Sequence, residues 1–229
     1  MRPGLALIVL AMSASGCTEG GRPLVILQNL APEENCQFPA QEGADRIVRG
    51  RIDVQAEEGY LFAPLVQNNA VGLADNPGAR LAAIEGADVE LTLQEGFTPA
   101  SDPADELSFT AYFSGAIQPD GGLASFAFIV LTKQFMETFI EPALPPGPPM
   151  EVIARIVVFG QMGGSTTESV PFNYPIEVCN GCMTVDVGAC ADLPADYEAL
   201  TGGICNTLQD VPLECCDDFT VCPATPPTV

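Results

Sequence analysis

The 229-residue chain has no histidine and no tryptophan, and only eight lysine and arginine residues stand against thirty acidic ones. Without histidine, the chain cannot form a Ser-His or Cys-His catalytic pair or a metal centre with histidine ligands. A formal net charge of −22 repels phosphate, which excludes nucleic-acid binding as the main function. The same charge argues against adhesion to anionic lipids through a basic patch, and the low aromatic content, 7%, argues against a stacking surface for carbohydrates.

The N-terminus has the pattern of an export signal. Residues 1–16 contain a weakly basic start, an apolar stretch over 4–14, and small residues before Cys17. A helix of that stretch would rise only ~16 Å, which is about half of a hydrocarbon core and too short to span a membrane. Residues 1–16 are therefore predicted to be a cleaved secretion signal.

The sequence Ala14-Ser15-Gly16-Cys17 resembles the bacterial lipobox, although Ala14 stands where leucine is usual. In lipoproteins with this motif, the cysteine thiol is acylated and becomes the mature N-terminus. The resemblance implies lipidation of Cys17 and contact with a membrane through this anchor, and an ordinary secretion signal is the alternative. No other apolar run reaches about 18 residues, so the sequence predicts no spanning helix elsewhere.

Eight further cysteines remain when Cys17 is set aside. An even number in an oxidising compartment predicts up to four disulfides, but the spacing does not give the pairing. The neighbours Cys215 and Cys216 are expected to have different partners, because a bond between them would close a strained ring. Seven of the eight lie between positions 179 and 222, at a density typical of a disulfide scaffold. The predicted disulfide residues are Cys36, Cys179, Cys182, Cys190, Cys205, Cys215, Cys216 and Cys222.

Composition divides the chain after the signal into three parts. Residues 17–43 are predicted to hold the lipidated cysteine and a tether, because glycine and proline punctuate them, although 24–27 have the pattern of a short strand. Residues 44–178 have the alternation of strands. Residues 179–229 are predicted to form a small Cys-rich module with a Pro-rich tail, which is expected to be disordered.

Residues 44–178 are predicted to form about seven strands and a single short helix at 133–140. This pattern, without alternating long helices, favours an all-β fold. The specific prediction is an antiparallel β-sandwich of immunoglobulin or fibronectin type, and a barrel is the alternative. Three dense apolar runs are predicted as central strands, and the others alternate between polar and apolar residues. The runs are 52–54, 60–66, 89–93, 107–113, 125–131, 152–159 and 169–178.

The last of these runs contains two prolines, Pro171 and Pro175, at positions of equal parity. In a regular strand, both missing N–H groups would lie on the same side, along the hydrogen-bonding direction. Such a strand can pair fully through its other side only. The strand over 169–178 is therefore predicted to be an edge strand.

The sequence Cys179-Asn180-Gly181-Cys182 is the clearest candidate for chemistry. A C-x-x-C in a thioredoxin-like fold gives a reactive thiol, but no βαβ pattern surrounds this one, and Asn-Gly is typical of a tight turn. A structural disulfide is the favoured interpretation, and redox chemistry or zinc binding are the alternatives. Zinc would need further thiolates from the module without any histidine, and no second C-x-x-C is present.

Three groups of acidic residues raise the question of calcium binding. None has the spacing of an EF-hand loop, so a solvated acidic surface is the favoured interpretation. No nucleophile or phosphate-loop motif is present, and the sequence predicts neither an enzyme nor a cofactor. The groups are Asp102, Asp105 and Glu106; Asp186, Asp192 and Asp196; and Glu214, Asp217 and Asp218.

Three segments of the chain resemble a family of secreted lipoproteins of myxobacteria and related bacteria, to which no activity is assigned. They are 60–68, 85–89 and 171–182, and the last of these, which contains Val-Cys-Asn-Gly-Cys before the Cys-rich end, is the most specific. The likeness would cover about residues 36–222. The resemblance implies an exported, lipid-anchored, disulfide-bearing β protein, and it brings no catalytic residues.

The sequence as a whole predicts a protein that is lipid-anchored in the bacterial cell envelope, at the outer membrane, facing either the periplasm or the surface. Its expected role is non-catalytic, as a binding or structural module with a protein or polymer partner. The alternative is a redox- or zinc-active envelope protein that uses Cys179 and Cys182.

Overall fold

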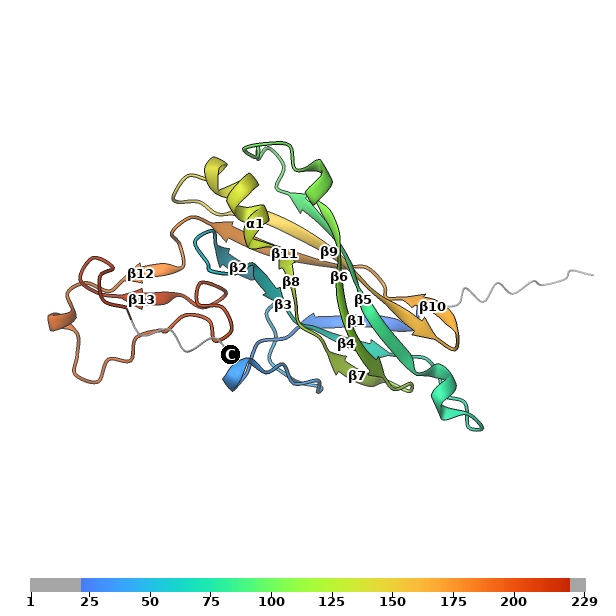
Figure 1. Ribbon diagram of the computed structural model, residues 1–229. Helices are drawn as coiled ribbons and strands as arrows, with labels where there is room; N and C mark the ends of the chain where they lie inside the picture. The colour runs from blue at the N-terminus through green and yellow to red at the C-terminus, as the bar shows by residue number, and fades with distance from the viewer. Residues whose placement is uncertain (1–21, 223–229) are drawn as a thin grey trace, which may run out of the picture.

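The computed structural model describes residues 22–222, so the predicted signal, Cys17 and the Pro-rich tail lie outside the described residues. Within them, the chain forms an all-β body followed by a disulfide-rich C-terminal module (Figure 1). The strands are β1 Leu24–Asn29, β2 Gly50–Asp53, β3 Tyr60–Phe62, β4 Pro64–Asn68, β5 Ala82–Leu93, β6 Ser108–Ile117, β7 Gly122–Ser125, β8 Phe128–Leu131, β9 Met150–Met162, β10 Ser165–Glu168, β11 Phe172–Cys179, β12 Thr184–Asp186 and β13 Leu213–Cys215.

The body is a sandwich built around one large sheet. That sheet has six strands in the order β2-β11-β9-β5-β6, with β10 beside β9. The opposing layer is divided between a three-stranded sheet, β1-β4-β7, and the pair β3-β8. The main core of buried side chains contains residues from both layers, for example Phe62 and Val130 from the small sheets and Ile156 and Ile176 from the large one.

Alternation along the sequence explains why the large sheet has one buried face. In β5, Ile84, Val89 and Leu91 are buried, whereas the acidic residues between them are exposed. The phase shifts by one residue at a bulge between Ile84 and Gly86. A side chain at Gly86 would meet the carbonyl oxygen of Ala111 on β6, so glycine permits the two strands to approach at the bulge.

The all-β prediction is confirmed, but the strands are more numerous than expected, and two of the predicted runs are divided. The run at 60–66 divides at Ala63 into β3 and β4, which pair with different partners. The run at 125–131 divides in the same way into β7 and β8. One pairing, between β2 and β11, is parallel rather than antiparallel. The helix is confirmed: α1 (Lys133–Phe135) begins at Thr132, whose side chain caps it, and the helical turns continue to Ala143.

The prediction that residues 169–178 form an edge strand is wrong. Strand β11 lies between β9 and β2, and β2 pairs with its last four residues, Ile176–Cys179. The reasoning about proline nevertheless explains where the pairing with β2 begins. Pro171 precedes the strand, and Pro175 faces Ile153 of β9 just before the pairing with β2 begins. The prolines therefore lie in the half of the strand that has β9 alone as its partner.

The prediction that residues 17–43 form a tether is wrong from residue 24 onward. Strand β1 pairs with β4, and Leu24 and Ile26 are buried in the core, as the strand-like pattern at 24–27 allowed. Further along, Cys36 is joined by a disulfide to Cys205. The glycine and proline content suggested a flexible segment, but two buried aliphatic side chains and a disulfide fix it to the body.

All eight described cysteines form disulfides. Two of the bonds, Cys190–Cys216 and Cys215–Cys222, lie within the module, so the neighbours Cys215 and Cys216 have different partners, as expected. Cys179–Cys182 closes the turn that leaves β11, and Cys36–Cys205 joins the module to the body. Four disulfides indicate an oxidising compartment outside the cytoplasm. In the part of the chain that the structure describes, no helix has the length and apolar character needed to cross a membrane.

A candidate ligand site between the sandwich and the module

A segment of the module pairs with β2 and so extends the large sheet at its edge. The N–H of Asp53 donates to the carbonyl of Leu208, and the N–H of Asp210 donates to the carbonyl of Arg51, at 3.1 and 2.9 Å. These two bonds flank an antiparallel bridge between Ile52 and Gln209. Residues 208–210 therefore continue the sheet beyond β2, although they follow it by about 150 positions in the chain.

Side-chain amides fasten this segment to the opposing layer as well. Gln209 accepts a hydrogen bond from the N–H of Leu61 and donates one to the carbonyl of the same residue, both at 2.9 Å. Asn206 donates to the carbonyl of Gly59 at 3.0 Å. Because Asn206 and Gln209 are both buried, the module is held against the body by satisfied polar groups rather than by surface contacts.

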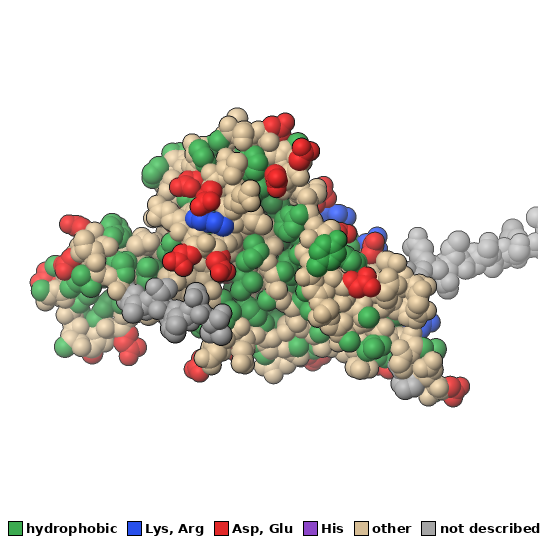
Figure 2. Space-filling model, viewed as in Figure 1, with side chains coloured by type: hydrophobic (Ala, Val, Ile, Leu, Met, Phe, Trp, Pro, Cys, Tyr) green, Lys and Arg blue, Asp and Glu red, His purple; other side chains and the backbone are tan. Residues whose placement is uncertain are grey.

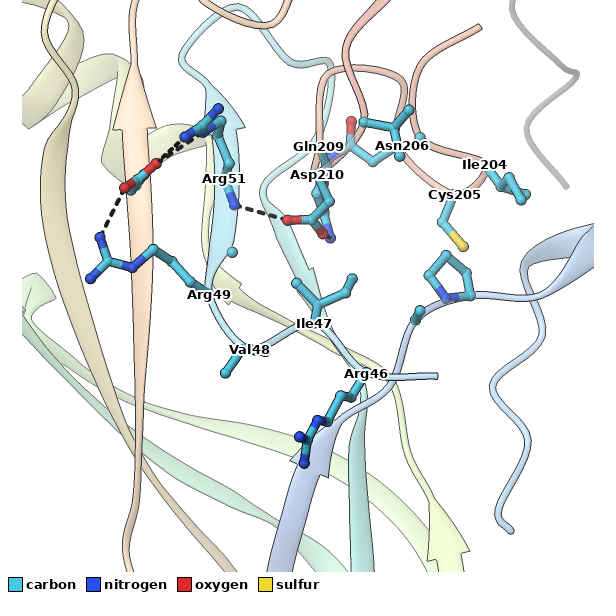
Figure 3. Close-up of a pocket in the computed structure, with 16 residues that line it drawn as sticks. Arg46, Ile47, Val48, Arg49, Arg51, Ile204, Cys205, Asn206, Gln209 and Asp210 are labelled. Carbon is cyan, nitrogen blue, oxygen red and sulfur yellow. Dashed lines mark hydrogen bonds and ion pairs between the residues drawn. The ribbon is translucent and has the colours of Figure 1, made fainter. Parts of the chain in front are cut away.

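A cleft of about 560 Å³ lies where the module meets the body (Figure 3). One wall is the segment 46–51, which leads into β2, and the other is the module segment 203–211. Ala31 and Pro32 complete the lining, and the disulfide Cys36–Cys205 joins the two sides. The volume lies within the range of pockets that hold small molecules, and the covalent link and the sheet pairing make the cleft preformed.

Three of the eight basic residues in the chain line this cleft: Arg46, Arg49 and Arg51. Glu177 on β11 accepts from two of them, at 2.8 Å from Arg49 and 2.6 Å from Arg51. Arg49 also pairs with Glu151 at 3.1 Å. Hydrogen bonds from Arg51 and Arg49 lower the pKa of Glu177, so this carboxylate is charged and bound at neutral pH.

A chain of buried polar groups extends into the protein from Asp210, which lines the cleft. The Asp210 carboxyl accepts from the Tyr60 hydroxyl at 3.0 and 3.2 Å, and the hydroxyls of Tyr60 and Tyr174 lie 2.9 Å apart. Asn29 donates to the Tyr174 hydroxyl at 2.8 Å. Because the Tyr60 hydroxyl has one proton and gives it to Asp210, the Tyr174 hydroxyl must donate to Tyr60. The hydrogen bonds thus run in one direction, from Asn29 to Asp210.

Burial shifts the titration of these groups. It raises the pKa of Tyr60 well above the usual tyrosine range, with a further contribution from the charge of Asp210, and it also raises the pKa of Tyr174. The pKa of Asp210 is raised by burial as well, against the opposing effect of its hydrogen bonds. Gly50 makes the arrangement possible, because a side chain there would overlap the Tyr60 ring.

Large apolar side chains are exposed at the same opening. Val48, between Arg46 and Arg49, is 74% exposed, and Ile204 on the module side is 47% exposed (Figure 3). Val211 is also exposed. The cleft therefore combines apolar walls with a few fixed polar groups, which is the usual composition of a ligand site.

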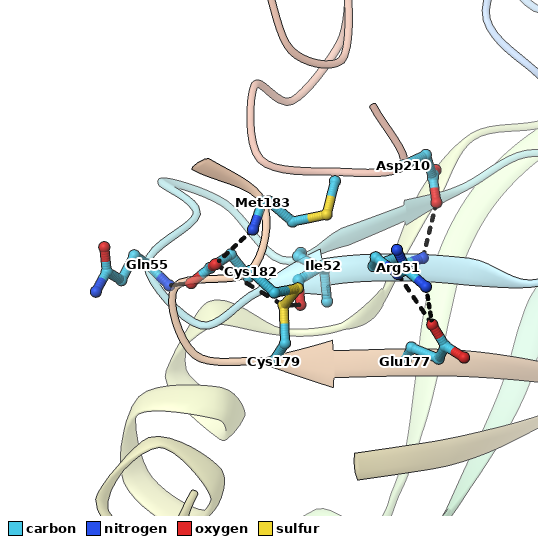
Figure 4. Close-up of a disulfide and its surroundings, with 9 residues drawn as sticks. Arg51, Ile52, Gln55, Glu177, Cys179, Cys182, Met183 and Asp210 are labelled. Atoms are coloured by element: carbon cyan, nitrogen blue, oxygen red, sulfur yellow. Dashed lines mark hydrogen bonds and ion pairs between the residues drawn. A yellow bond between two sulfur atoms is a disulfide. The ribbon is translucent and has the colours of Figure 1, made fainter. Parts of the chain in front are cut away.

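The C-x-x-C motif is an intact disulfide at the end of β11 (Figure 4). Cys179 is fully buried, and its sulfur lies 3.8 Å from the Asp53 carboxylate, which accepts from the N–H of Met183. Asp53, Cys179 and Cys182 are the single set of three potential metal ligands brought together within residues 22–222. In this state the two sulfurs are bonded to each other, so neither is a thiolate.

The acidic groups singled out in the sequence do not converge among the described residues. Figure 2 shows acidic side chains distributed over several parts of the visible face. Several make local hydrogen bonds instead: Asp186 accepts from the N–H of Gly188, and Asp217 accepts from the N–H of Cys190. Glu214 accepts from the Tyr197 hydroxyl at 2.7 Å. These carboxylates stabilise turns of the module.

Sequence reasoning missed the cleft, because its walls come from distant parts of the chain. One signal was present: three arginines within six residues of a chain that has so few basic residues. No protein-family model, no curated protein and no solved structure matches the chain.

Proposed function

We propose that this chain is an exported, lipid-anchored envelope protein that binds a ligand without transforming it, in the cleft between the sandwich and the module. The observation that carries the proposal is the construction of the cleft. Its two walls come from different parts of the fold and are held together by a disulfide, an added strand and buried amide hydrogen bonds. A site fixed in this way loses little conformational entropy when a ligand binds.

A binding role also agrees with the state of the acidic groups in the cleft. Glu177 is held by two arginines, and Asp210 accepts from Tyr60, Gln209 and the N–H of Arg51. Both carboxyls act as structural acceptors, and an engaged carboxylate is poorly placed to work as a general base. The exposed valine and isoleucine side chains supply contact area instead.

The lipid anchor and the outer membrane belong to the proposal and rest on residues 1–17 of the sequence. The measurement is the intact mass of the protein purified from native membranes, with and without reduction and alkylation. We expect the loss of residues 1–16, an acylated Cys17, and eight thiols that react only after reduction. An unmodified Cys17 would refute the anchor.

The second candidate function is a redox- or zinc-active site at Cys179 and Cys182. It is favoured by the carboxylate of Asp53, which would join the two thiolates as a third ligand if the disulfide were reduced. The same mass measurement separates the candidates. Two free or metal-bound thiols before reduction would support this function and oppose a purely structural role for the turn.

Binding in the cleft is tested with two fluorescent reporters that share one ring system. 1-Anilinonaphthalene-8-sulfonate carries a sulfonate, and N-phenyl-1-naphthylamine is its uncharged counterpart. Saturable binding of either dye should weaken at least several-fold when Val48 and Ile204 are both changed to serine, because apolar contact area is lost.

The matched control changes Val71 and Leu73 to serine. These residues are 77% and 46% exposed, close to the exposed fractions of Val48 and Ile204, and they do not line the cleft. Binding of neither dye, or binding equally affected by both double variants, would refute the cleft as the ligand site.

A further inference from the structure

The arginines of the cleft have unused hydrogen-bond donors, whereas its carboxylates already accept hydrogen bonds from the protein. Both oxygens of Glu177 accept from arginines, and both oxygens of Asp210 accept from groups of the protein. The guanidinium groups are different, since each has five N–H donors. Arg51 uses two of its donors on Glu177, and Arg49 gives one to Glu177 and pairs through another nitrogen with Glu151. The cleft thus has donors to spare, while its two carboxylates are already engaged by groups of the protein.

Arg46 is the strongest sign of this imbalance. Within residues 22–222, its guanidinium has neither a side-chain hydrogen bond nor an ion pair, although it lines the cleft of a chain with many acidic residues. Among the cleft-lining residues, three arginines stand against two carboxylates. Glu151, which pairs with Arg49, balances the third arginine, so the cleft is close to neutral in a protein whose net charge is strongly negative. At physiological salt, charges beyond about 8 Å are largely screened, so the cleft repels an anion less than the acidic surface does, and Arg46 offers it a cation without an ion pair.

Apolar surface adjoins these donors on both walls. Val48 lies between Arg46 and Arg49 in the chain, and Ile204 is a lining residue on the module side. An acidic head group that accepts from the arginines would therefore place an attached tail against valine and isoleucine. Guanidinium groups bind carboxylate and phosphate through paired N–H donors, and each buried apolar contact adds hydrophobic stabilisation.

From this juxtaposition we infer that the cleft binds a small amphiphile with a single acidic head group, carboxylate or phosphate, and an apolar tail. The inference rests on the proposed function and names its ligand class. The head group lies at Arg46. The tail lies along Val48 and Ile204. A cationic ligand is disfavoured, because both carboxylates of the cleft already accept from arginines or other groups of the protein.

The first test compares the two dyes on the unaltered protein. Because they differ by the sulfonate, we expect the anionic dye to bind at least about tenfold more tightly than the neutral one. The variant Arg46→Gln should weaken the anionic dye about tenfold and leave the neutral dye unchanged. Arg80→Gln is the matched control, because Arg80 is also exposed and without an ion pair in the described part of the chain, and it does not line the cleft. It should change neither affinity.

The second test displaces the bound anionic dye with decanoate, decyl phosphate or decanol. Displacement by either acid at concentrations where decanol has no effect supports the inference, and the stronger acid identifies the head group. Equal displacement by decanol overturns it, as does an affinity for the anionic dye that Arg46→Gln leaves unchanged. If the neutral dye binds as tightly as the anionic one and its affinity falls when Val48 and Ile204 are changed, the cleft is a ligand site, but the inference of an acidic head group is wrong. If neither dye depends on these residues, the proposed function itself fails.

Discussion

The variant Tyr60→Phe tests whether the buried hydrogen bonds below the cleft stabilise the junction between the module and the sandwich. The change removes one oxygen and keeps the ring, which packs at 5.9 Å between centroids from the ring of Tyr174. It deletes the donor to Asp210 and the acceptor for the Tyr174 hydroxyl. Any effect on the free energy of unfolding therefore comes from hydrogen bonding rather than from lost packing.

The magnitude follows from what each partner retains. Asp210 still accepts from the N–H of Arg51 at 2.8 Å and from Gln209 at 3.0 Å, and Tyr174 still accepts from Asn29. No carboxylate is left without donors, so the full cost of an orphaned buried charge does not arise. A hydrogen bond contributes about 1.5–3 kcal/mol net when one partner is charged and about 0.5–1.5 kcal/mol when both are neutral. We expect Tyr60→Phe to lower the free energy of unfolding by about 2–4 kcal/mol, the sum of the two contributions.

The assay is equilibrium unfolding in guanidinium chloride with the disulfides intact, at neutral pH. The midpoint should fall while the denaturant slope stays constant, since the surface exposed on unfolding is unchanged. Tyr197→Phe is the matched control, because Tyr197 also donates to a carboxylate, Glu214 at 2.7 Å, but on the protein surface. Its effect should lie within experimental error. An equal effect of the two variants would refute the reasoning, because it would show that burial adds nothing to the Tyr60 hydrogen bonds.

Three further predictions concern the junction. Replacing both Cys36 and Cys205 by serine should lower the free energy of unfolding by about 2–5 kcal/mol, since this bond closes the longest loop in the chain, and calorimetry with the other disulfides intact would measure it. Gly50→Ala should cost about 1–3 kcal/mol in chemical denaturation, because the new methyl group would overlap the neighbouring tyrosine ring. Glu177→Gln should cost less than about 1 kcal/mol at neutral pH, since its ion pairs lie near the surface. Because folding lowers the pKa of Glu177, its contribution is present above the ordinary glutamate pKa and is lost as the pH falls through the lowered value, so a pH series of urea melts should show the variant and the unaltered protein converging in acid.

Each of these predictions has an outcome that contradicts it. Gly78→Ala is the control for Gly50→Ala, because nothing at that position lies closer than 3.9 Å to the added methyl group, and equal losses would exclude a steric cause. An unchanged stability after loss of the Cys36–Cys205 bond would mean that the noncovalent contacts alone fix the module. A difference for Glu177→Gln that persists or grows in acid would show that its effect is not electrostatic.

Local sequence patterns predicted strands that have one buried and one exposed face. They failed for strands whose position depends on pairing with a segment far away in the sequence. Residues 89–93 alternate because one face of β5 is buried, and this is visible without knowing its neighbours. Strand β1 was mistaken for part of a tether, because its burial depends on pairing with β4. The sandwiched position of β11 was missed for the same reason, since its parallel partner β2 precedes it by more than 120 residues. Composition and local period contain no information on such partners.

The candidate site shows the same limit more strongly. The cysteine count indicated four disulfides, but it could not indicate that Cys36 would join Cys205 and so bring residues 46–51 opposite the module. Asp210 looked like one acidic residue among many until the fold placed it against Tyr60. Chemistry that depends on a single segment, such as the turn at Cys179–Cys182, was within reach of the sequence. Chemistry assembled from several segments was not.

The strand-like segment at residues 208–210 also determines how the sandwich ends. Strand β2 is the last strand of the large sheet, and its outer backbone groups bond to this segment. A chain cut after Val178 would therefore expose an unpaired strand edge of the kind that recruits other chains and leads to aggregation. The Cys-rich module therefore covers the outer edge of the large sheet. Its disulfides help to keep this edge covered, although most of them do not join the sheet itself. The body and the module are consequently one structural unit, even though their compositions differ so sharply.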